Sequence, residues 1–149
     1  MPRWLIVVLL IGVSALATCG VAFGAGAWWF NKNKAGLVAQ GLEAKNEGEA
    51  FGQQHQDREC VGEVLGRLTP QSSFTEEIRL RLFLASCVKA AERAPGYCEA
   101  VPLPSAVLKV SAWALDTCGR AGRGTDQPCT RVVQGAIDGC HPRTDPSTH

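Results

Sequence analysis

Six cysteines beyond position 59 constrain the fold of this 149-residue chain more than any other feature. They are Cys60, Cys87, Cys98, Cys118, Cys129 and Cys140. An even number of cysteines within about a hundred residues is typical of a disulfide framework outside the cytoplasm. A domain of roughly 90 residues buries only a marginal core, so covalent crosslinks supply stability that its size cannot provide.

Helix geometry decides which of these cysteines can pair. Cys129 and Cys140 share one predicted helix face, but the helix between them spans about 16 Å, so they cannot bond to each other. Cys118 and Cys129 lie on either side of one predicted hairpin loop, which leaves Cys140 within reach of Cys98. We therefore expect the bridges Cys118–Cys129, Cys98–Cys140 and Cys60–Cys87, with Cys87–Cys98 and Cys60–Cys140 as the alternative.

An uncharged apolar run, Trp4–Phe30, precedes the cysteines. A bilayer core of roughly 30 Å needs about 20 helical residues, which is fewer than this run contains. Trp4 lies at one end, and Trp28 and Trp29 lie at the other, as expected for indole rings at the two headgroup regions. We expect residues 4–30 to contact membrane lipid as a single transmembrane helix.

A cleaved signal peptide is the alternative interpretation of the same run. Small residues occupy the cleavage positions of two sites, Ala15-Leu16-Ala17 and Ala25-Gly26-Ala27. Cleavage after Ala17 would leave an apolar stub on the mature protein, which argues against that site. We favour an uncleaved signal-anchor, with a secreted or periplasmic protein after cleavage as the alternative.

Charge and cysteine content indicate opposite orientations of the membrane helix. Arg3 flanks one end of the run, and Lys32 and Lys34 flank the other, so the positive-inside rule leans slightly toward a cytoplasmic C-terminal part. The cysteines need an oxidising compartment to form bridges. Because the charge difference is small, we expect a single-pass protein of the bacterial inner membrane with its C-terminal domain in the periplasm.

Two glycines within the run have the spacing of a helix contact. Gly20 and Gly24 form a small-xxx-small pair, which lets two membrane helices pack closely. Because glycine is also common in membrane helices generally, this single pair gives only a weak indication of a homodimer.

The chain divides into four predicted segments. They are a transmembrane anchor with its flanks at 1–34, a polar juxtamembrane stalk at 35–56, a helical cysteine-rich domain at 57–141 and a disordered tail at 142–149. Four glycines weaken any helix in the stalk, each by about 1 kcal/mol relative to alanine. They are Gly36, Gly41, Gly48 and Gly52. We therefore expect the stalk to be a frayed or continuous but exposed helix.

Apolar periodicity predicts four helices in residues 57–141. The first ends near Leu68, and the second begins after Ser73, which opens a capping box with Glu76. Ser105 is the predicted cap of the third helix, which carries Trp113 into the core. One face of this third helix holds Val107, Val110, Ala114 and Cys118. The fourth helix begins near Asp126, and its apolar stripe is Cys129, Val132, Val133, Ala136, Ile137 and Cys140.

These patterns predict an all-α fold class. The expected architecture is an N-terminal single transmembrane helix followed by a small disulfide-stapled four-helix bundle of two hairpins.

No catalytic constellation is evident in the sequence. The histidines lie in the stalk and around the tail, outside any core pattern that holds a nucleophile. They are His55, His141 and His149. The cysteine spacing fits neither a zinc site nor a C-x-x-C redox pair, so we expect no metal and no cofactor. A net charge of +1 removes the electrostatic case for nucleic acid binding.

Arg120 and Arg123 are the candidate binding residues. They lie in the glycine loop 119–124, whose backbone amides and guanidinium groups could hold an anion, although an ordinary hairpin loop explains them as well. The sequence therefore predicts a membrane-anchored extracytoplasmic helical module with a structural or protein-interaction role. An enzyme with an active site assembled from scattered residues is the alternative.

Overall fold

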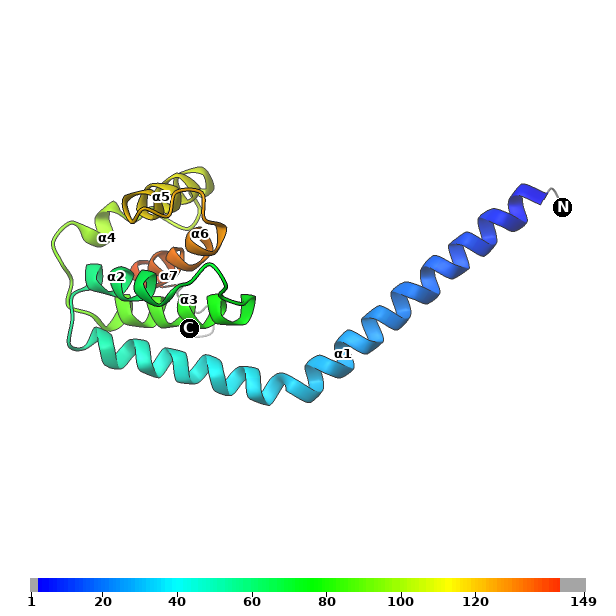
Figure 1. Cartoon of the computed structure of the whole chain (residues 1–149), viewed down its shortest axis with the longest axis horizontal. Helices are drawn as coiled ribbons and strands as arrows, with labels where there is room; N and C mark the ends of the chain where they lie inside the picture. The colour runs from blue at the N-terminus through cyan, green and yellow to red at the C-terminus, as the bar shows by residue number, and fades with distance from the viewer. Residues whose placement is uncertain (1–2, 143–149) are drawn as a thin grey trace, which may run out of the picture. The chain divides into compact units, whose positions relative to one another are not determined.

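The computed structural model describes the backbone of residues 3–142 and the side chains of residues 26–28 and 31–142. Within these ranges the chain is helical, without a strand, and one isolated bridge pairs Gln56 with Glu92. The all-α class predicted from the sequence is confirmed. The helices are α1 (Arg3–Gly52), α2 (Asp57–Arg67), α3 (Phe74–Ala90), α4 (Tyr97–Ala100), α5 (Val107–Arg120), α6 (Gln127–Val133) and α7 (Gly135–Cys140) (Figure 1).

The chain forms two compact units, Met1–Ala39 and Gln40–His149. In the first unit, the ammonium group of Lys32 lies 5.1 Å from the ring centroid of Trp28, within cation–π range. Among the side chains that the structure describes, no helix combines the length and apolar character that crossing a bilayer requires. The structure describes no side chains for most of the predicted transmembrane run, for the Gly20–Gly24 pair or for the predicted tail beyond position 142.

The second unit begins at Gln40, inside the segment predicted as a stalk. Ala44 on α1 is buried, and the ring of Phe51 lies 5.9 Å from that of Phe83 on α3. Arg67 at the end of α2 pairs with Glu47 on α1 at 2.6 Å and stacks over the Phe83 ring at 4.5 Å. The end of α1 therefore belongs to the core of the domain.

Glycines allow α1 to approach α3 at backbone distance. A methyl group added at Gly48 would overlap the carbonyl oxygen of Phe83, and one added at Gly52 would overlap that of Cys87. Helix propensity alone predicts that these two glycines weaken the helix of an exposed stalk. Their lack of a side chain instead permits the contact, because any Cβ atom would hold the two helices apart.

A second close approach holds α7 against α3. A Cβ atom at Gly135 would meet the carbonyl oxygen of Arg81, and one at Gly139 would meet Ala85 and Val88. The predicted fourth helix is in fact two helices, α6 and α7, which meet at Gln134. Its predicted apolar stripe is buried from Cys129 to Ile137, while Cys140 is half-buried.

Three disulfides join the helices in pairs. Cys60–Cys87 links α2 to α3, Cys98–Cys140 links α4 to α7, and Cys118–Cys129 links α5 to α6. These are the three bridges expected from the sequence. The alternative bridges, Cys87–Cys98 and Cys60–Cys140, are not formed. Each bridge contributes about 2–4 kcal/mol by restricting the unfolded chain.

The third predicted helix is less buried than its pattern indicated. Ser73 caps α3 as predicted, but the N-cap of α5 is Ala106 rather than Ser105. Val107 is 67% exposed, and only Ala114 and Cys118 of the predicted face are buried. The reason is length, because α5 has 14 residues and packs against α6, which has 7.

Two glycine substitutions should affect stability in opposite directions. Gly48→Ala should lower the free energy of unfolding by about 1–3 kcal/mol, because the added methyl group forces α1 away from α3. Gly66→Ala, on the open face of α2, should raise it by about 1 kcal/mol through helix propensity. Urea unfolding followed by circular dichroism measures both, and equal effects at the two positions would contradict the close contact.

Candidate functional site

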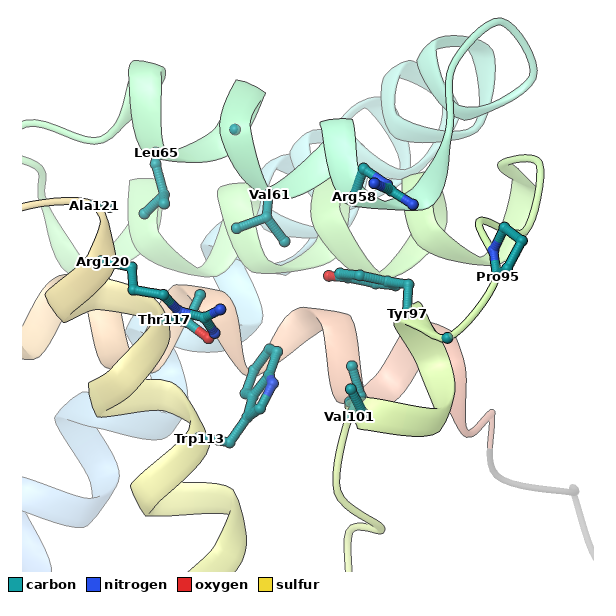
Figure 2. Close-up of a pocket in the computed structure, with 13 residues that line it drawn as sticks. Arg58, Val61, Leu65, Pro95, Tyr97, Val101, Trp113, Thr117, Arg120 and Ala121 are labelled. Carbon is teal, nitrogen blue, oxygen red and sulfur yellow. The ribbon is translucent and has the colours of Figure 1, made fainter.

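A hollow of about 530 Å³ opens between α2, α4 and α5 (Figure 2). We call it the α2–α4–α5 groove. It is lined by Arg58, Val61, Gly62, Leu65, Pro95, Gly96, Tyr97, Ala100, Val101, Trp113, Thr117, Arg120 and Ala121. Most of these residues are apolar, and the polar side-chain groups among them are two hydroxyls, two guanidinium groups and the indole N–H of Trp113.

A buried carboxylate positions the side of the groove formed by α4. Asp57 is fully buried at the start of α2, and its Oδ1 accepts hydrogen bonds from the backbone N–H of Arg58 at 2.9 Å and of Ala94 at 3.2 Å. The chain then turns at Gly96, where φ is 79°, a value that favours glycine. These contacts place Tyr97 at the first position of α4.

Arg123 connects the end of α5 to α2. Its guanidinium donates to the carbonyl oxygens of Leu68 at 2.6 Å and Leu65 at 3.3 Å, and to the carboxylate of Asp126 at 2.9 Å. The side chain is only 18% exposed. Because the carbonyls at the end of a helix lack partners within it, this arginine satisfies two of them and stabilises the wall of the groove.

The structure does not bring Arg120 and Arg123 together as an anion site. Arg120 lines the groove and pairs with Asp116 at 2.7 Å in an exposed i,i+4 contact. Arg123 is occupied by the carbonyls of α2 and does not line the groove. The predicted pair therefore separates into one groove residue and one residue with a structural role.

Two hydroxyl groups in the groove are buried without a hydrogen-bond partner. They are the Oη atom of Tyr97 and the Oγ1 atom of Thr117. In Figure 2 the hydroxyl end of Tyr97 points into the middle of the groove, toward the side from which Thr117 and Arg120 project. Leaving a buried hydroxyl unpaired costs about 1–3 kcal/mol, so a polar ligand atom at this place would recover free energy.

Burial changes the ionisation of Tyr97. Removal of the phenol from water, and secondarily the negative charge of Asp57, raise the pKa of Tyr97 from 10.0 to about 12. The hydroxyl therefore remains protonated, and able to donate a hydrogen bond, at every physiological pH.

Positive charge dominates the edge of the groove. Its lining contains Arg58 and Arg120 but neither aspartate nor glutamate. Arg58 is exposed, and within the described part of the chain its guanidinium forms no ion pair. A ligand with a negative group therefore meets the guanidinium of Arg58, unpaired within the described residues, whereas the charge of Arg120 is offset by Asp116.

A second hollow of about 510 Å³ adjoins the groove. The two share Ala100, Val101 and Trp113, so the indole ring stands where they meet. Trp113 was predicted in the core, but it is half-buried and forms a wall of both hollows. Leu103, which is 59% exposed, extends the apolar surface beyond it.

The other titratable candidates have structural contacts. His55 stacks on Phe51 and its Nδ1 lies 2.9 Å from the Phe51 carbonyl oxygen, while the Nε2 atom of His141 lies 3.0 Å from that of Val101. Over the residues that the structure describes, no three His, Cys, Asp or Glu side chains form a cluster able to hold a metal ion. His149 lies outside those residues.

Sequence reasoning missed three residues of the groove. Arg58, Tyr97 and Thr117 come from three different helices, and no motif connects them. One signal was present, because Tyr97 is the only tyrosine of the chain and follows the turn-forming Pro95-Gly96 pair.

No family model, no curated protein and no solved structure matches this chain.

The single tyrosine makes its environment directly measurable. In the folded chain the phenolate absorbance should appear with a midpoint near pH 12, and in the urea-unfolded chain near pH 10. The folded state holds its proton more tightly, so this stabilising contribution is complete below pH 10 and is lost as the pH rises toward 12. Circular dichroism confirms that the chain is still folded, and a midpoint near 10 in that state would contradict the burial of Tyr97.

Proposed function

We propose that this chain is a membrane-tethered, extracytoplasmic binding module that takes a ligand in the α2–α4–α5 groove. The apolar run at residues 4–30 acts as the tether, and the disulfide-linked domain lies on the oxidising side of the membrane. The domain works by binding, and its groove is the contact surface.

Three disulfides in a small domain support the extracytoplasmic location. Such bridges persist in the periplasm and in secreted proteins, whereas cytosolic thiols are kept reduced. The bridges also join α4 to α7 and α5 to α6, and α4 and α5 form two sides of the groove. A cytoplasmic location would therefore weaken the part of the domain that carries the site.

The observation that carries the binding role is the pair of unpartnered hydroxyls in an apolar groove. Buried polar groups in folded proteins are nearly always hydrogen-bonded, and exceptions call for an explanation. Tyr97 and Thr117 both line the same hollow, so a polar ligand atom bound there would offer these hydroxyls a partner.

The location has a direct test in bacterial spheroplasts that express the full chain. Protease added outside should remove the C-terminal domain, and a thiol reagent should label none of its six cysteines until a reductant is added. A cytoplasmic marker protein checks that the spheroplasts are intact. Survival of the domain together with six reactive thiols would show that the proposed location is wrong.

The binding role can be tested with a variant whose new side chain fills the groove. The full chain with Trp4, Trp28 and Trp29 changed to Phe keeps Trp113 as its only tryptophan. N-phenyl-1-naphthylamine, an uncharged apolar fluorophore, should accept energy from Trp113 when it binds beside it. Gly62→Phe should reduce this affinity by about tenfold or more, because the ring occupies the groove.

Gly66→Phe is the matched control for that variant. Gly66 lies one turn further along α2 and outside the groove, and a Cβ atom at either glycine meets nothing within 4 Å. Both variants should therefore fold. Equal energy transfer in the two variants would show that the groove is not the binding site.

A further inference from the structure

We infer that the ligand of the α2–α4–α5 groove is a free carboxylate amphiphile, a molecule with one acyl chain and one ionised carboxyl group. This inference rests on the proposed binding function and specifies its ligand. The groove offers apolar surface and hydrogen-bond donors, and different residues carry each of them.

The apolar body of the groove suits an acyl chain. Val61 and Leu65 on α2 face Val101 and Trp113 across the hollow (Figure 2). Its volume of about 530 Å³ lies within the range of small-molecule sites. Burial of each methylene group of a chain in such surroundings contributes about 0.8 kcal/mol.

The polar groups of the groove are donors. The hydroxyls of Tyr97 and Thr117 lack partners, and the guanidinium groups of Arg58 and Arg120 carry donors only. An ionised carboxylate accepts hydrogen bonds and donates none, so it matches this set. An amine would find no carboxylate in the lining, and an uncharged head group would leave the guanidinium of Arg58 without a counter-charge.

The adjoining hollow gives the chain room to continue. It shares Ala100, Val101 and Trp113 with the groove and adds Leu103, whose side chain is largely exposed. An acyl chain that passes Trp113 would cover this apolar surface. The indole ring therefore lies against the ligand and reports its presence.

The test uses the full chain with Trp113 as its only tryptophan, held in phosphatidylcholine nanodiscs at pH 8. Dodecanoate should change the Trp113 emission in a saturable manner. Dodecanol has the same chain without the charge and should bind about tenfold more weakly, since charge-assisted hydrogen bonds are lost. Acetate has the charge without the chain and should give no response. Empty nanodiscs correct for partition into lipid.

Variants that remove one charge test which residues of the groove bind the ligand carboxylate. Arg58→Gln should weaken dodecanoate binding by about fivefold to tenfold and leave dodecanol binding unchanged, and Arg120→Gln should have a smaller effect, because Asp116 already pairs with Arg120. Lys89→Gln removes one exposed positive charge from α3, outside the groove, and should have no effect. Tyr97→Phe should weaken dodecanoate binding in the same direction, because the donor is lost while the ring remains.

Each outcome decides between the inference and the binding function on which it rests. If dodecanol binds as tightly as dodecanoate, and Gly62→Phe removes both, the groove binds apolar molecules but the carboxylate assignment is overturned. A response to phosphatidylglycerol in the nanodisc, in place of dodecanoate, overturns the free acid in favour of a membrane headgroup. If neither Gly62→Phe nor the arginine variants affect dodecanoate, both the inference and the groove are wrong.

Discussion

Close packing of helix backbones against α3 is the constraint on which the domain depends. The end of α1 meets one part of this helix through Gly48 and Gly52, and α7 meets another through Gly135 and Gly139. At these positions a single methyl group would separate the helices, so small residues determine how the domain closes. The disulfide Cys60–Cys87 then fixes α2 to the same central helix.

The groove forms where this helix packing leaves parts of α2, α4 and α5 uncovered. The helix α5 packs against α6, which is half its length, so the first part of α5 is exposed at Val107 and Leu108. Disulfides hold α4 and α5 in place, Cys98–Cys140 for α4 and Cys118–Cys129 for α5. Crosslinks therefore maintain an open hollow that a larger apolar core would otherwise have filled.

The polar groups around the groove include two kinds. Asp57 and Arg123 are buried or nearly so and satisfy backbone groups, which positions α4 and α5. Tyr97 and Thr117 are buried without partners, and Arg58 forms no ion pair within the described residues. The first kind stabilises the groove, and the second kind gives it a preference for an acceptor with negative charge.

The sequence by itself determined the helical class, the cap at Ser73 and the buried stripe from Cys129 to Ile137, because these depend on local spacing. Loop and helix lengths also favoured the three cysteine pairs that the structure contains. Only the tertiary structure decided the role of Gly48, the exposure of Val107 and the separation of Arg120 from Arg123. Each of these depends on which helix lies opposite and how long it is, and periodicity along one helix carries no information about its neighbour.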